Sequence, residues 1–191
     1  MAKGNLTKLT TNEKGYLGEM KFKSIIEHAV GDDVKVLYNV NIPKVDNDTT
    51  QVDFMIFSPH KFICVEVKAW DCTIYVRNTR YWKIVYGNRE IMVVNPIQQN
   101  ASHVSAIYKH TTKHFENRVC FVEAPDIYDA PEEVVSPLEI IKELSTGPVL
   151  YTAEEVEAEY QKFKKISQDS LYLAMYKALN IRKKPHKEIK L

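Results

Sequence analysis

Residues 51–70, QVDFMIFSPHKFICVEVKAW, contain two apolar runs rich in β-branched and aromatic residues, separated by the turn-like sequence SPHK. Such residues favour strands, so this stretch predicts a hairpin of two neighbouring strands. Three charged side chains, those of Asp53, Glu66 and Lys68, interrupt the apolar pattern. The rest of the chain is therefore organised around charges that lie where a core is expected.

The charges of the second strand are predicted to lie on one face. Side chains alternate between the two faces of a strand, so Cys64, Glu66 and Lys68 point to the same side. Burying a carboxylate or an ammonium costs several kcal/mol unless a counter-charge or a metal compensates. Asp53 is the candidate to share a divalent cation with Glu66, although the same residues also fit the solvated face of an antiparallel sheet.

The chain of 191 residues is 45% hydrophobic and 27% charged, which is typical of one globular domain. We expect an N-terminal extension at residues 1–12, a domain at residues 13–181 and a basic tail at residues 182–191. The sequence has no apolar leader and no run long enough to cross a bilayer, so we expect a cytoplasmic protein with no membrane partner. Its three cysteines form no C-x-x-C pair and are expected to be reduced.

Charge is distributed unevenly behind a net value of +1. Residues 123–159 contain eleven acidic residues and one lysine, whereas the rest of the chain has 25 basic and 14 acidic residues. Such a division can leave a basic face that attracts a polyanion, while an acidic helical surface is also a routine aid to solubility. Charge alone therefore leaves nucleic-acid binding open.

The first helix is predicted over residues 13–30. Its apolar residues recur at helical spacing, and Glu19 falls on the same stripe, which directs its carboxylate toward the body of the protein. Gly15 and Gly18 would allow another backbone to approach that carboxylate closely. The alternative is an acid placed early in the helix to interact with the helix dipole.

Further strands are predicted at residues 34–43, 73–77, 81–86 and 89–94. The region of residues 73–94 combines aromatic residues with four basic residues, Arg77, Arg80, Lys83 and Arg89. Basic side chains interleaved with aromatic rings suit a phosphate backbone and unstacked bases, so these four residues are the predicted DNA contacts. The same pattern also occurs on many exposed sheets, so an ordinary solvent-exposed surface is the alternative.

Asn95-Pro96 marks the start of a helix that is predicted to continue to about residue 115. Gln99 lies in its first turn, where a helix N-terminus favours an anion. His103 is assigned to a basic surface on the same face as Gln99. The predicted packing stripe of the helix consists of four residues, Ile97, Ala101, Val104 and Tyr108.

The remaining sequence predicts strands at residues 118–123 and 134–135 and three helices, at residues 137–144, 153–165 and 168–180. The sequence contains no internal repeat, no Gly-rich phosphate loop and no serine or cysteine triad pattern.

Together these pieces resemble the nuclease-related domain (NERD) family, a branch of the PD-(D/E)xK nucleases. The resemblance covers roughly residues 13–110. It rests on GYLGE at residues 15–19, TQVD at 50–53, VEVKAW at 65–70, Trp82, and NPIQQN at 95–100 with His103. Phe54 and Cys72 stand where similar chains often have histidine and glycine, which affects the neighbours of the site and not its charged residues.

The resemblance implies an α/β fold, a restriction-endonuclease-like mixed sheet flanked by helices. It also implies that Glu19, Asp53, Glu66, Lys68 and Gln99 converge at one edge of the sheet as the catalytic residues of a DNA nuclease. Asp53 and Glu66, with the Val67 carbonyl and Glu19, would bind Mg²⁺ or Mn²⁺, which prefer oxygen ligands. Lys68 would position or activate the attacking water, and Gln99 would orient that water or bind phosphate.

Two other functions stay open from the sequence. One is a DNA-binding or repair-associated adaptor that keeps the fold without cutting, and the other is a protein-interaction domain that uses an acidic face at residues 123–159. The presence of Glu19, Asp53, Glu66 and Lys68 favours the enzyme, because a binding-only protein is free to lose one of them. The sequence indicates neither the form of DNA that is cut nor whether the chain forms a homodimer.

Overall fold

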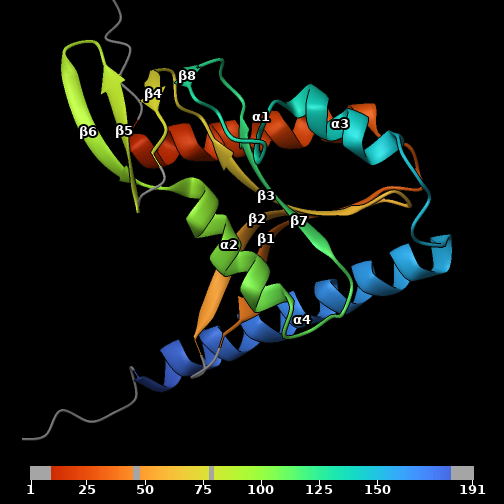
Figure 1. The fold of residues 1–191 in the computed structure, drawn as a ribbon. Helices are drawn as coiled ribbons and strands as arrows, with labels where there is room; N and C mark the ends of the chain where they lie inside the picture. Colours follow the sequence, from red (N-terminus) through yellow and green to blue (C-terminus); the bar gives the residue numbers. More distant parts are fainter. Residues whose placement is uncertain (1–9, 45–47, 78–79, 182–191) are drawn as a thin grey trace, which may run out of the picture.

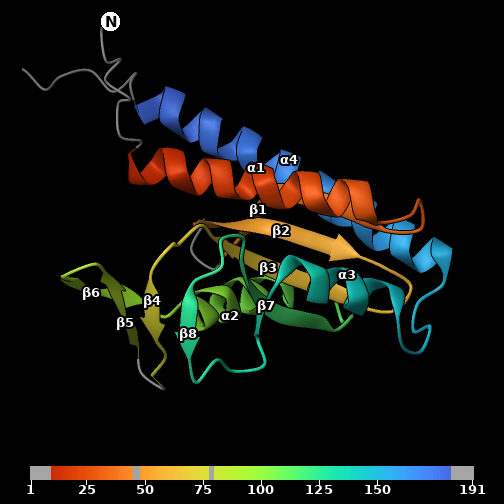
Figure 2. The same cartoon turned by 90° about the horizontal axis from the view of Figure 1, so that it is seen from above.

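The computed structural model describes residues 10–44, 48–77 and 80–181. The predicted basic tail at residues 182–191 lies outside these ranges, as do residues 1–9 of the predicted N-terminal extension. Within them the chain forms two β-sheets and four helices (Figures 1 and 2). The predicted α/β class, a mixed sheet flanked by helices as in restriction endonucleases, is confirmed.

The main sheet has five strands in the order β1-β2-β3-β7-β9. Antiparallel pairing joins β1 (Lys35–Pro43), β2 (Thr49–Phe57) and β3 (Phe62–Lys68). Parallel pairing adds β7 (Phe115–Phe121) and β9 (Val134–Val135) on the other side of β3. The hairpin predicted at residues 51–70 is therefore confirmed, and it lies at the centre of a mixed sheet.

A second sheet of four strands, in the order β6-β5-β4-β8, packs beside the main one. Its strands are β4 (Thr73–Tyr75), β5 (Tyr81–Tyr86), β6 (Arg89–Val94) and β8 (Asp126–Tyr128). The buried side chains of Ile74, Trp82 and Ile84 pack against Val119 and Phe121 of β7. Strands β5 and β6 match their predicted bounds, whereas β4 is shorter than residues 73–77 and β8 was not predicted.

Helices cover both faces of the main sheet. On one face lie α1 (Thr11–Ala29) and α3 (Pro137–Ser145) (Figure 1). Their apolar residues, such as Phe22 and Ile140, pack against Ile63 and Val65. On the other face lie α2 (Pro96–Ile107) and α4 (Ala153–Ile181), which contribute apolar residues such as Ile107 and Phe163 to a second core around Cys64. The predicted alternation along β3 is confirmed, because Ile63 and Cys64 belong to different cores.

The first helix begins earlier than predicted. Thr10 is its N-cap, and Thr10 and Glu13 form a reciprocal capping box, with Thr10 N bonded to Glu13 Oε2 at 2.7 Å. The helix therefore starts at Thr11 and ends at Ala29, so the predicted start at residue 13 falls inside its first turn. The capping box was missed because three neighbouring polar residues could each serve as the cap.

The second helix ends at Ile107, so the prediction that it continues to about residue 115 is wrong. Tyr108 causes much of the difference. Its hydroxyl donates to the Phe115 carbonyl and accepts from the Phe115 N–H, both at 3.3 Å, which fixes a turn and starts β7 three residues before the predicted strand at 118–123. Such a contact between a side chain and a distant backbone leaves no periodic signal in the sequence.

One continuous helix, α4, replaces the two helices predicted at residues 153–165 and 168–180. Two serine hydroxyls near the expected break form hydrogen bonds that are compatible with a continuous helix. Ser167 Oγ accepts a hydrogen bond from Asn41 N on β1 at 2.9 Å, and Ser170 Oγ donates to the Ile166 carbonyl at 2.8 Å. Ser167 thus ties the helix to the edge strand β1, while Ser170 bonds within the helix, and neither residue ends it.

The acidic segment at residues 123–159 does not form one face. It contributes α3 to one side of the main sheet and the start of α4 to the other. Several of its acids are paired with bases from elsewhere, as in Glu123 with Lys21 at 3.1 Å and Glu143 with Arg118 at 3.1 Å. The single acidic face that the protein-interaction hypothesis requires is therefore absent among the described residues.

All three cysteines are free thiols, as expected. No helix within the described part of the chain is both long and apolar enough to span a bilayer.

Close packing at Gly18 gives a test of the fold. A Cβ at this position would lie 2.5 Å from Ala69 Cβ, directly after β3, whereas a Cβ at Gly15 would meet nothing within 4 Å. We expect Gly18→Ala to lower the free energy of unfolding by about 1–3 kcal/mol. Gly15→Ala is the matched control and should be neutral or stabilising by about 0.5–1 kcal/mol, since alanine favours a helix interior. Urea unfolding measures both, and equal stabilities of the two variants would refute the packing.

Candidate active site

The candidate site is built where the pairing of β2 and β3 stops. The last pair in the β2–β3 ladder is Phe54 with Val65, so Val67 has no paired residue in β2. Asp53 supplies a side-chain partner, because its Oδ2 accepts a hydrogen bond from Val67 N at 2.9 Å. The carboxylate of Asp53 is thereby fixed against β3, beside the residues that follow Val65.

A local irregularity in β1 and β2 accompanies Asp53. The β1–β2 register skips Asn39 and Asp53, which lie between the pairs Tyr38–Phe54 and Val40–Val52, and Asn39 has a positive φ of 53°, in the left-handed region. On one side of this point Phe54 packs in the α1 core, and on the other side Val52 packs in the α2 and α4 core. In a regular strand Val52 and Phe54 would share one face, because they are two residues apart, but here they lie on opposite faces. Asp53, between them, marks the position where the strand changes face.

Glu66 is the centre of the hydrogen-bonded site and is only 2% exposed. Its Oε1 accepts from Lys68 Nζ at 2.6 Å and from Gln99 Nε2 at 2.6 Å. Lys68 Nζ also lies 3.5 Å from Gln99 Oε1. The structure therefore brings together three of the five predicted catalytic residues through direct contacts.

His103 joins the site from the next turn of α2. Its Nε2 lies 3.5 Å from Glu66 Oε2, and its Nδ1 lies 2.7 Å from Thr50 Oγ1. The prediction of a basic surface that includes His103 is wrong, because this side chain is buried. A sequence signal was available, since Gln99 and His103 are four residues apart and share one helix face. Thr50 gave no such signal.

Asn100 holds α2 in place over the sheet and was also missed. Its Nδ2 lies within hydrogen-bond distance of the Cys64 carbonyl at 2.8 Å, Asn117 Oδ1 at 2.7 Å and the Arg118 carbonyl at 3.0 Å. These contacts turn α2 so that Ala101 and Tyr108, two residues of the predicted packing stripe, are exposed. Polar anchoring therefore decides which face of α2 meets the site.

Glu19 approaches the site from α1. The preceding residue, Gly18, lets α1 come close to Ala69, so Glu19 is carried toward the end of β3. Burial raises the pKa of Glu19, repulsion from Glu66 raises it further, and the charge of Lys68 partly offsets both. Glu19 is therefore close enough to Glu66 and Lys68 to interact with their charges.

The two central carboxylates have opposite pKa shifts. Burial and repulsion from Glu66 raise the pKa of Asp53 to about 7, against the opposing hydrogen bond from Val67 N. Burial alone would raise the pKa of Glu66, but contacts with His103 and Lys68 outweigh it and keep that pKa below its ordinary value. Glu66 is thus favoured as the anion, whereas the Val67 N–H and the charge of Lys68 compensate Asp53 only in part.

This donor set fits a hard divalent cation. Asp53 and Glu66 offer oxygen ligands, and Glu66 Oε2 is buried without a hydrogen bond that meets normal geometry. Among the residues that the structure describes, no three His, Cys, Asp or Glu side chains converge as a ready ligand cluster. Mg²⁺ does not require one, because it typically uses one or two carboxylates and keeps several waters.

Of the predicted DNA-contact residues, Lys83 and Arg89 lie on strands of the second sheet, whereas Arg77 and Arg80 lie in the connection between β4 and β5. Arg77, Arg80 and Arg89 are exposed, whereas Lys83 is half-buried and paired with Glu90 at 3.1 Å. Arg89 is paired with Tyr86, which lies three residues after Lys83 on β5. Because side chains alternate between faces, Lys83 and Arg89 project from opposite faces of the hairpin. Any DNA that contacts both must reach around the β5–β6 hairpin.

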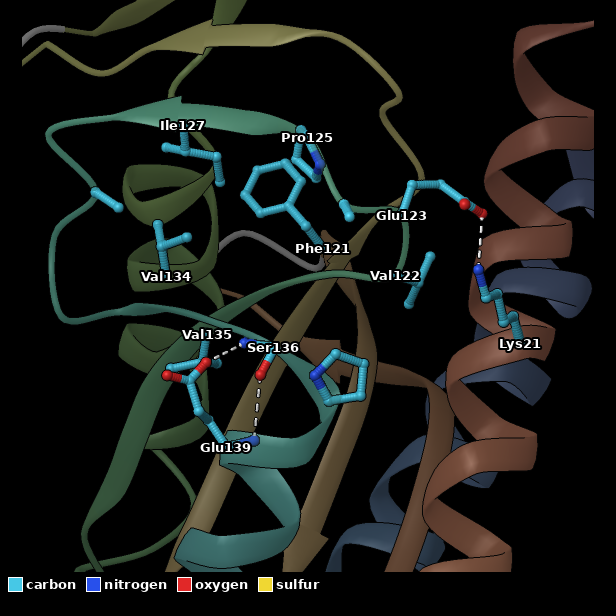
Figure 3. Close-up of a pocket in the computed structure, with 13 residues that line it drawn as sticks. Lys21, Phe121, Val122, Glu123, Pro125, Ile127, Val134, Val135, Ser136 and Glu139 are labelled. Atoms are coloured by element: carbon cyan, nitrogen blue, oxygen red, sulfur yellow. Dashed lines mark hydrogen bonds and ion pairs between the residues drawn. The ribbon is translucent and has the colours of Figure 1, made fainter.

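A cavity of about 610 Å³ is lined by residues of α1, α3, β7, β8 and β9 (Figure 3). Its floor is apolar and includes Phe121 and Val135. The polar groups at its rim are already paired: Lys21 with Glu123 at 3.1 Å, Ser136 N with Glu139 Oε2 at 2.6 Å, and the Ser136 hydroxyl with Glu139 N at 3.3 Å. None of the five predicted catalytic residues lines this cavity, so it is not the candidate site.

Comparison with protein families gives one match, to the nuclease-related domain, over residues 14–122. This range contains all the residues described above for the candidate site. Comparisons with curated proteins and with solved structures found no match.

The raised pKa of Asp53 predicts a pH dependence of stability in metal-free protein. The folded pKa of about 7 exceeds the ordinary value of 3.8, so the folded state retains the proton in this range and wild-type stability falls as pH rises from about 4 to 7. Asp53→Asn keeps an acceptor for Val67 N and does not titrate. Its stability advantage over wild type should grow across this window, by at most ~4 kcal/mol, and stay constant above it.

Urea unfolding in EDTA at pH 4, 6 and 8 measures this difference. Asp169→Asn, at an exposed position of α4, is the control and should track wild type at every pH. An advantage of Asp53→Asn that is the same at all three pH values would contradict the assignment.

Proposed function

Because this chain belongs to the nuclease-related domain family, we propose that it is a metal-dependent nuclease that hydrolyses phosphodiester bonds in DNA. The observation that carries the proposal is the group of Asp53, Glu66 and Lys68 at the end of β3. Two interacting carboxylates beside an ammonium are suited to a cation and a phosphate, whereas a structural ion pair needs only one acid and one base.

Asp53 and Glu66 would hold Mg²⁺ or Mn²⁺, with the Val67 carbonyl and water as further oxygen ligands and Glu19 near a second position. When bound, such a cation polarises the phosphate and lowers the pKa of a coordinated water. The raised pKa of Asp53 supports this assignment. Burial beside the charge of Glu66 destabilises the Asp53 carboxylate, and a bound cation would stabilise it.

Lys68 and Gln99 are the groups that meet the substrate in this proposal. Lys68 Nζ is held 2.6 Å from Glu66 Oε1, where its charge can offset the negative charge that develops on phosphorus. Gln99 offers both a donor and an acceptor amide group, which suits the orientation of a water. It also lies near the start of α2, where the helix dipole favours a phosphate.

Thr50 and His103 are positioning residues in this account. Thr50 Oγ1 fixes the ring of His103 at Nδ1, and the ring restricts Glu66 Oε2 from the side opposite Lys68. If the Thr50 hydroxyl donates to Nδ1, the proton of the neutral imidazole resides on Nε2 and faces Glu66. Outer contacts of this kind orient a ligating carboxylate before the cation arrives.

Purified protein with Mg²⁺ or Mn²⁺ is expected to nick or degrade DNA. Asp53→Asn removes a ligand charge and Lys68→Ala removes the ammonium, so each should lower the cleavage rate by about 100-fold or more. Cleavage of labelled duplex and single-stranded DNA, followed on denaturing gels, measures the rate.

Asp169→Asn and Lys165→Ala are the matched controls, because both positions are exposed on α4 and should leave the rate unchanged. Undiminished cleavage by a folded Asp53→Asn variant would show that the activity arises elsewhere. DNA binding without any cleavage under these conditions would support the adaptor instead.

The predicted DNA contacts make a separate prediction about salt. Each lysine or arginine that neutralises a phosphate adds about 1 to the slope of log affinity against log salt concentration. Arg80→Gln, Lys83→Gln and Arg89→Gln should therefore each lower the slope by about 1, as measured by fluorescence anisotropy in EDTA. Lys165→Gln is the control, and a variant with an unchanged slope identifies a residue that does not contact phosphate.

A further inference from the structure

A row of four side chains crosses the outer face of the second sheet. Tyr128 of β8 is paired with Tyr75 of β4, Tyr75 with Lys83 of β5, and Lys83 with Met92 of β6. Directly paired residues point to the same face of a sheet, so the four side chains form one line, which we call the outer row. The opposite face of the sheet carries Ile74, which is buried against the body.

The outer row exposes aromatic and apolar surface. Tyr128 is 55% exposed, Met92 54% and Tyr75 37%. Figures 1 and 2 both show the β5–β6 hairpin, which carries part of this sheet, extending beyond the main sheet at one end of the molecule. Contiguous exposed apolar surface of this kind is a candidate binding surface.

The rings of the outer row are ordered before any ligand binds. Tyr75 and Tyr128 are stacked, with centroids 5.2 Å apart and planes 8° from parallel. Lys83 Nζ lies 4.6 Å from the centroid of Tyr75, and Glu90 holds Lys83 at 3.1 Å. Tyr75 is thus fixed by both neighbours, and Tyr128, on the edge strand, presents the exposed end of the stack.

Charged residues are distributed unevenly on the two sides of the outer row. Two acidic side chains on this face, Asp126 and Glu90, lie in the neighbouring row, where they pair with Thr73 and Val85, and one exposed acid, Asp129, follows Tyr128 at the end of β8. Exposed Arg77 and Arg80 lie beyond the other side of the outer row, after β4 and before β5. A polyanion that crosses the rings is therefore drawn to the arginine side and repelled from the acidic side.

The second sheet is joined directly to the candidate site. Strand β6 ends at Val94, and the next residue, Asn95, caps α2, whose Gln99 is bonded to Glu66. Asn95 N also donates to the Arg80 carbonyl at 2.9 Å, which ties the start of β5 to the start of α2. A nucleic acid held on this sheet is thereby linked through one short connection to the residues that would cut it.

We propose that the outer row is a stacking surface for the unpaired bases of single-stranded DNA, so that the enzyme prefers single strands or frayed ends to intact duplex. The proposal rests on the proposed nuclease function for its choice of ligand. Rings on an exposed sheet stack with bases of any sequence, whereas the base faces of a duplex are hidden within its own stack. Arg77 and Arg80 supply the phosphate contacts beside the rings.

Fluorescence anisotropy in EDTA tests the surface without cleavage. Labelled oligo(dT) and a labelled duplex hairpin are titrated with wild type, Tyr128→Ala, Tyr128→Phe and the Tyr75→Ala/Tyr128→Ala double variant. We expect about ten-fold weaker binding of oligo(dT) by the two alanine variants, with duplex affinity unchanged, and wild-type binding by Tyr128→Phe. Tyr172→Ala is the matched control, because Tyr172 is 73% exposed on α4.

A second readout distinguishes stacking from charge attraction. An oligonucleotide with one 2-aminopurine should lose fluorescence when it binds wild type and keep it with Tyr128→Ala at saturating protein. Equal losses of single-strand and duplex affinity would overturn the proposal, as would tighter binding of oligo(U) than of oligo(dT). A dimer of the free protein that Tyr128→Ala dissociates would assign the surface to a second copy and overturn it too.

The outcomes separate this proposal from the proposed function. If wild type cleaves DNA but the tyrosine variants bind single strands normally, the outer row is rejected and the nuclease remains. If wild type neither binds nor cleaves any DNA, both are rejected.

Discussion

The burial of two interacting carboxylates, Asp53 and Glu66, is the constraint on which the rest of the structure depends. Glu66 is stabilised as an anion by Lys68, Gln99 and His103, which come from β3 itself and from α2. Asp53 accepts a backbone N–H and is only partly compensated by the charge of Lys68, so its pKa is raised. The folded protein therefore contains an uneven distribution of charge that a divalent cation would balance.

The surrounding elements are placed to maintain this arrangement. Asn100 anchors α2 to β3 and β7 through three hydrogen bonds, and Gly18 allows α1 to approach Ala69. At Asn39 the strands β1 and β2 exchange the faces on which their side chains pack, next to Asp53. Each of these features is local, yet together they direct side chains from four elements to one end of β3.

Much of this arrangement could be predicted from the sequence, because the charged residues of β2 and β3 interrupt strong strand patterns. The features that the sequence did not reveal depend on contacts between distant residues. The hydrogen bonds between the Tyr108 hydroxyl and the Phe115 backbone accompany the early end of α2. The hydrogen bond from Asn41 N to Ser167 Oγ accompanies the continuation of α4. His103 was predicted to be a surface residue, since its burial depends on Thr50, which lies 53 positions away. Periodicity reports which face is apolar and carries no information about such polar contacts.

Cation binding, measured apart from catalysis, is the most direct test of the central claim. Electron paramagnetic resonance of Mn²⁺ titrated into the protein counts the bound ion without substrate. The account predicts that wild type and Asp169→Asn bind Mn²⁺ with equal affinity and that Asp53→Asn binds it at least about ten-fold more weakly. Equal Mn²⁺ affinity for wild type and Asp53→Asn, or no binding by folded wild type, would contradict the account.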